Sequence, residues 1–105
     1  MTDDEGVRTE AARVVDRLRT MPLTRLAAPW PPHPSRAAGA RALAQRLADR
    51  AADLTGGPRR DVPDVGDAAV GDQVAVTLAD LLAMSPPPGV LADVAEDLIR
   101  VRQEL

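Results

Sequence analysis

The chain has 105 residues, a length typical of one domain, so we predict a single helical domain over residues 1–105. It has no cysteine, which excludes disulfides, thiolate chemistry and cysteine-bound zinc. Its net charge of −3 is unevenly distributed: residues 21–60 carry seven arginines and two aspartates, whereas residues 61–105 carry two arginines and nine acidic residues. We expect these two regions to attract each other, within one fold or between two chains.

The first predicted helix covers about residues 4–21. Its apolar residues recur at spacings of three and four, which gives a helix one apolar face for a core. Pro22 should end this helix, because the residue before a proline resists helical torsions. The apolar face consists of Val7, Ala11, Val14, Val15, Leu18 and Met21.

A proline-rich connection follows, and its segment PWPPHP holds Trp30 and His33, the only tryptophan and the only histidine. A core of Val, Leu and Ala has few large side chains, so we predict that Trp30 covers an open end of the bundle as a lid. One alternative is that the segment adopts an extended polyproline II form and docks into a partner, with Trp30 as an exposed anchor. Another is a disordered linker. We expect no metal or catalytic role for His33, since no cysteine or second histidine accompanies it.

The second predicted helix begins at Ser35, a suitable N-cap, and ends near Leu54, where TGGP follows. Its apolar line is Ala40, Leu43, Leu47, Ala51 and Leu54. The third covers about residues 67–84. Its segment QVAVTL alternates as a strand would, but a helix is favoured because the 3.6-residue period extends on both sides. The stripe of the third helix is Val70, Val74, Leu78, Leu81 and Leu82.

The fourth predicted helix follows SPPPG and carries two heptads of apolar a and d positions. Ile99 lies beside this seam, where a second copy of the chain would bury it; the alternative is that it packs under the Trp30 loop of a monomer. The residues expected on the exposed side are Asp93, Glu96, Asp97 and Arg100. We therefore predict an all-α fold, a small antiparallel four-helix bundle with a proline-rich first connection. The seam is Leu91, Val94, Leu98, Val101 and Leu105.

The stretch AVGDQVAVTLADLLA, residues 69–83, resembles a segment of short actinobacterial proteins that have no established function. The abundance of alanine and the use of arginine in place of lysine agree with such a source. The resemblance implies an origin for the chain, and it implies no chemistry.

No catalytic or cofactor motif is present, so we expect neither enzymatic activity nor a cofactor. The only two serines, Ser35 and Ser85, precede predicted helices and are interpreted as caps. In the second helix, Arg46 and Arg50 are spaced to pair with Asp49 and Asp53. We therefore do not expect nucleic acid as the partner, although a nucleic-acid accessory protein using these arginines remains an alternative.

The sequence thus predicts a small non-enzymatic protein that acts through protein–protein interaction, with a homodimer as one form. A further alternative is a protein that binds a small molecule or a cation in the bundle interior. Such a site needs polar groups on the apolar stripes, and Thr77 is the best candidate for one. The N-terminal MTDDEGVRTE lacks the apolar core of a signal peptide, and no apolar run reaches the roughly 18 residues of a membrane span, so we expect a cytoplasmic protein that does not bind membranes. The expected interaction residues are Trp30, His33, Arg46, Arg50, Leu98 and Ile99.

Overall fold

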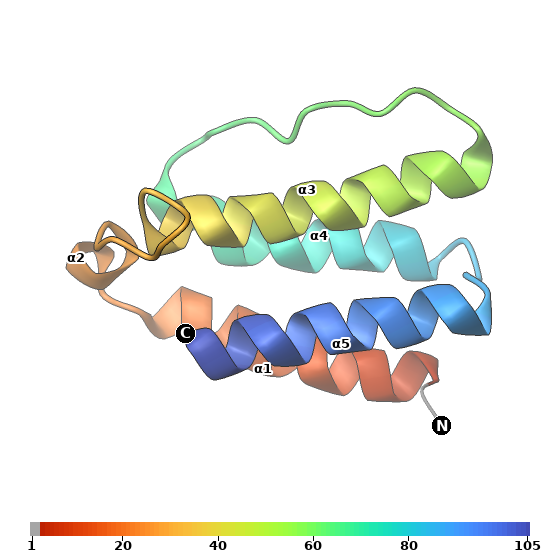
Figure 1. The fold of residues 1–105 in the computed structure, drawn as a ribbon, viewed down its shortest axis with the longest axis horizontal. Helices are drawn as coiled ribbons and strands as arrows, with labels where there is room; N and C mark the ends of the chain where they lie inside the picture. The colour runs from red at the N-terminus through yellow and green to blue at the C-terminus, as the bar shows by residue number, and fades with distance from the viewer. Residues whose placement is uncertain (1–2) are drawn as a thin grey trace.

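Four long helices lie side by side in the structure, a computed structural model that describes residues 3–105 (Figure 1). No strand occurs in these residues, so the predicted all-α class is confirmed, and the segment QVAVTL is helical. None of the helices in the described chain has both the length and the apolar composition needed to cross a bilayer. The elements are α1 (Asp4–Thr20), α2 (Leu23–Leu26), α3 (Arg36–Thr55), the 3₁₀ turn η1 (Asp67–Ala69), α4 (Val70–Leu82) and α5 (Pro88–Glu104).

The helix ends mostly follow the local sequence signals. The Ser35 hydroxyl accepts a hydrogen bond from the backbone N–H of Ala38 at 3.0 Å, which confirms the predicted N-cap of α3. Gly56 ends α3 in the left-handed conformation, with φ of 71°. The interpretation of Ser85 as a cap is wrong, because α5 begins three residues later at Pro88, and its N-cap residue is Pro87, which provides no side-chain cap. Prolines suit a first helical turn, where their missing N–H costs no hydrogen bond.

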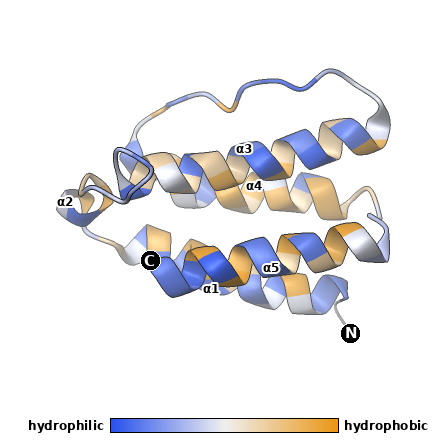
Figure 2. Cartoon of the chain, viewed as in Figure 1, coloured by the Kyte–Doolittle hydropathy of each residue, from blue (hydrophilic) through white to orange (hydrophobic). Residues whose placement is uncertain are grey.

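Apolar residues of all four long helices meet in one core, and apolar and polar segments alternate along α3 and α5 (Figure 2). The predicted apolar faces of α1, α4 and α5 are buried in full. The predicted line of α3 is buried at Ala40, Leu43 and Leu47. In the last turns of α3 the prediction weakens, since Ala51 is half-buried and Leu54 is exposed.

The direction of the helices differs from the predicted antiparallel bundle, because α3 and α4 run the same way (Figure 1). In contrast, α1 is antiparallel to α4, as Arg19 near the end of α1 pairs with Asp72 near the start of α4. Helix α5 is antiparallel to α3 and runs the same way as α1. The bundle therefore consists of two parallel pairs.

The segment of residues 57–66, here called the crossover, explains the parallel α3 and α4. It passes back along α3, so that the chain returns to the start of α3 before α4 begins (Figure 1). Gln45 of α3 holds it at two points: its amide nitrogen donates to the Arg60 carbonyl oxygen at 3.0 Å, and its amide oxygen accepts from the Val62 N–H at 2.7 Å. Arg41 fixes its far end by an ion pair with Asp64 at 3.1 Å.

Candidate functional site

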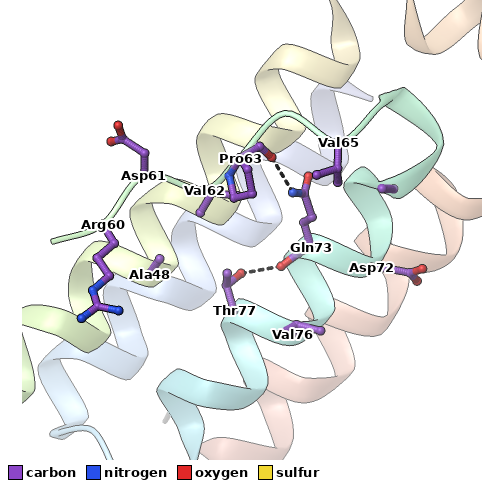
Figure 3. A pocket seen from close by; sticks show the side chains of 11 residues that line it. Ala48, Arg60, Asp61, Val62, Pro63, Val65, Asp72, Gln73, Val76 and Thr77 are labelled. Carbon is purple, nitrogen blue, oxygen red and sulfur yellow. Dashed lines mark hydrogen bonds between the residues drawn. The ribbon is translucent and has the colours of Figure 1, made fainter.

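A groove with mostly apolar walls lies between the crossover and the outward side of α4, and we call it the crossover groove (Figure 3). Its volume is about 490 Å³. Val65 of the crossover and Val76 of α4 both line it, although their side chains are 62% and 58% exposed. The other exposed large apolar residues in residues 3–105 are Leu23, at 61%, and Leu54, at 37%. Half of this exposed apolar set therefore gathers at one groove.

Three polar residues of α4 also line the crossover groove: Asp72, Gln73 and Thr77. The Gln73 amide nitrogen donates to the Pro63 carbonyl oxygen at 2.7 Å, which ties the crossover to α4 (Figure 3). The Gln73 amide oxygen is buried and has no hydrogen-bond partner within the described chain. The Thr77 hydroxyl donates to the backbone carbonyl oxygen of Gln73 at 2.8 Å, so its own helix satisfies it. The groove thus offers mainly apolar surface, because the unpaired Gln73 oxygen is itself buried.

A second, smaller site of about 280 Å³ lies where the proline-rich connection meets α3 and α5, and we call it the Trp30 pocket. Trp30 is half-buried against the core, and its ring stacks on that of His33 with centroids 5.7 Å apart. Its indole nitrogen donates to the Glu104 carbonyl oxygen at 3.3 Å. The structure therefore brings three predicted interaction residues together. The pocket is lined by Trp30, Pro31, Pro32, His33, Gly39, Arg46, Arg100, Val101 and Glu104.

Beside the Trp30 pocket, Asp97 of α5 holds two arginines. Its carboxylate accepts from Nε and Nη2 of Arg46 at 2.7 and 3.0 Å, and from Nη2 of Arg100. The prediction that Asp97 is exposed is wrong, since only 7% of the residue is accessible. A bidentate guanidinium satisfies both carboxylate oxygens, which allows the charge to be buried between α3 and α5.

Other arginines of the basic region also face acidic residues. Arg50 lies 3.8 Å from Asp93 of α5. Arg59 in the crossover pairs with Asp53 at 2.8 Å, and this hydrogen bond lowers the pKa of Asp53 from its ordinary value. The same contact raises the pKa of Arg59. The basic middle of the chain is thus matched, at these positions, by acids of the same fold.

The remaining predicted interaction residues have different surroundings. Leu98 is fully buried in the core, so it offers no surface to a partner, which corrects its place among the interaction residues. The neighbouring Ile99 is partly exposed on α5.

The crossover groove was not predicted from the sequence, although a signal for it was present. Val76 lies off the apolar stripe of α4, and Val65, like Val62, lies in an otherwise polar connection. Apolar residues outside every stripe are the feature that would have pointed to this surface.

The two sites differ in chemistry. The crossover groove suits apolar side chains, whereas the Trp30 pocket combines aromatic surface with guanidinium groups.

Comparison with known proteins finds no matching family model, no matching curated protein and no matching solved structure. Among residues 3–105, no three His, Asp or Glu side chains gather in a way that would hold a metal ion.

Proposed function

We propose that this is a non-enzymatic binding protein whose partner is another protein, held in the crossover groove. The observation that carries the proposal is the exposure of Val65 and Val76 in the same groove, at 62% and 58%. Each Å² of apolar surface removed from water contributes roughly 25 cal/mol, so exposed valines at a concave site favour an apolar partner. Clustered exposed apolar residues on a small protein are typical of interaction surfaces.

The geometry also describes the part of the partner that would bind. An apolar side chain would enter between the crossover and α4, against Val65 and Val76. Arg60 and Asp61 lie at the edge of the groove with opposite charges, which would affect the choice of partner more than the affinity (Figure 3).

The pairing of arginines supports this proposal over nucleic-acid binding. Arg46, Arg50 and Arg59 all face carboxylates within the fold, so phosphate groups would have to compete with those contacts. A cytoplasmic location and a homodimer, both expected from the sequence, belong to this proposal as well.

A binding comparison of two variants tests the proposal. The immobilised full chain is used to capture a partner from the source cells, and the captured protein is then purified and titrated against each variant. We expect Val76→Asp to weaken binding about tenfold or more, because a charge would have to be desolvated in the groove. Leu23→Asp is the matched control, since Leu23 is 61% exposed and does not line the groove.

Circular dichroism and urea unfolding establish that both variants keep the fold. Equal binding by Val76→Asp and by the wild type would contradict the proposal, as would failure to capture any protein above an uncoated support.

A further inference from the structure

The Trp30 pocket contains two arginines whose orientation is set by one buried carboxylate. The bonds to Asp97 use Nε and Nη2 of Arg46 and Nη2 of Arg100, which leaves Nη1 of both residues outside this cluster. Both arginines line the pocket. A guanidinium group held by a buried partner loses little side-chain freedom when it binds a second carboxylate.

An acidic residue also lines the pocket: Glu104, one turn after Arg100 on α5, whose backbone carbonyl accepts from the Trp30 indole. The two arginines and the two acids, Asp97 and Glu104, have no net formal charge together. A ligand that is itself neutral but carries separated charges suits such a site better than a phosphate dianion does.

The rest of the wall is apolar and aromatic. Trp30 and His33 form a stacked pair, and Pro32 and Val101 complete the surface. The volume of about 280 Å³ lies just below the roughly 300–1,000 Å³ of drug-sized ligand pockets, so the ligand must be small.

From these observations we propose that the Trp30 pocket binds a free amino acid with an apolar or aromatic side chain. The carboxylate of the amino acid accepts hydrogen bonds from Arg46 and Arg100. Its ammonium group faces Glu104, and its side chain packs against Trp30 and His33. This site is separate from the crossover groove and does not depend on the function proposed for that groove.

Titration of the full chain with L-phenylalanine tests the proposal. Trp30 is the only tryptophan, so its fluorescence, excited where phenylalanine does not absorb, reports on the pocket alone. The NMR signal of the Trp30 indole N–H gives a second readout. We expect both to change in a saturable way. Phenylalaninamide, which lacks the carboxylate, and N-acetylphenylalanine, which lacks the ammonium group, should each bind about tenfold more weakly, since each loses a charge-assisted contact.

Two matched variants assign the carboxylate contact. Arg100→Gln should weaken phenylalanine binding about tenfold and leave the fold intact, because the Arg100 side chain is 62% exposed. Arg13→Gln is the control, since its side chain is 56% exposed and lies outside the pocket. The proposal is overturned if neither signal saturates with phenylalanine, if either analogue binds as tightly as phenylalanine, or if the two variants bind alike.

Discussion

Gly39 of α3 leaves the space that the Trp30 ring occupies: a Cβ atom at position 39 would lie 2.0 Å from both Cε3 and Cζ3 of Trp30. We therefore predict that Gly39→Ala displaces the ring and destabilises the fold by about 1–3 kcal/mol, as overpacking does elsewhere. The gain in helix propensity, about 1 kcal/mol, opposes this loss. Trp30 fluorescence should shift to the red, and urea unfolding gives the change in stability.

Gly89→Ala is the control for this prediction. No atom lies within 4 Å of a Cβ at position 89, which is in the first turn of α5. This variant should be neutral, or more stable by up to about 1 kcal/mol. Unchanged emission and stability in Gly39→Ala would contradict the lid role of Trp30.

We predict that Asp97→Asn lowers the free energy of unfolding by about 1–3 kcal/mol. Arg46 would lose its carboxylate partner while its side chain remains only 37% exposed. Asp93→Asn should change stability by less than about 0.5 kcal/mol, because Asp93 is 63% exposed and its arginine lies at 3.8 Å. Similar urea midpoints for both variants would show that the buried position of Asp97 has no energetic consequence.

The contact with Arg59 keeps the pKa of Asp53 below its ordinary value, which gives a prediction on pH. Since the folded pKa lies below that of the unfolded chain, the stabilisation is complete above the unfolded pKa and is lost as pH falls through the folded pKa. Arg59→Gln should raise the pKa of Asp53 toward its ordinary value, as measured by NMR titration of the carboxyl carbon. Arg60→Gln should not, because Arg59 provides the hydrogen bond. An equal shift in both variants would show a general charge effect.

Adjacent residues of α5 should respond differently to the same substitution. Leu98→Asp should unfold the chain, because Leu98 is fully buried, whereas Ile99→Asp should stay folded, because Ile99 is partly exposed. If the predicted homodimer forms through α5, Ile99→Asp should also be monomeric in analytical ultracentrifugation. A monomeric wild type would contradict the homodimer. A dimer that survives Ile99→Asp would place the contact elsewhere.

Apolar periodicity was sufficient to predict the four long helices and most of the core. Val74, Leu81 and Val94 are buried where their stripes put them. The four-residue α2 was not predicted, because one turn after Pro22 is too short to show a period.

Three features could not be predicted from the sequence: the burial of Asp97, the direction of α4 and the Trp30 pocket. Each depends on contacts between residues that are distant in the sequence. Asp97 has a charged side chain of the kind that usually lies at the surface. Its burial depends in part on the bidentate contact with Arg46, 51 positions earlier. The crossover that sets the direction of α4 is held in part by Gln45, whose amide pairs with the crossover backbone as a strand would. Nothing in the local pattern around Gln45 marks it for that role. Arg100 likewise lines the Trp30 pocket, whereas the sequence pattern predicted only that it lies on the exposed face of its helix.

The parallel alignment of α3 and α4 depends on the length of the crossover. Helix α3 has 20 residues and is therefore about 30 Å long. The ten residues of the crossover reach at most about 33–36 Å when fully extended, so there is almost no slack. Losing three of them would shorten the reach by about 10 Å, and α4 would no longer start beside the beginning of α3. Insertions should lower the stability of the fold only slightly, because the entropic cost of closing a loop grows slowly with loop length. In related chains, deletions here should therefore be rare, whereas insertions should be tolerated.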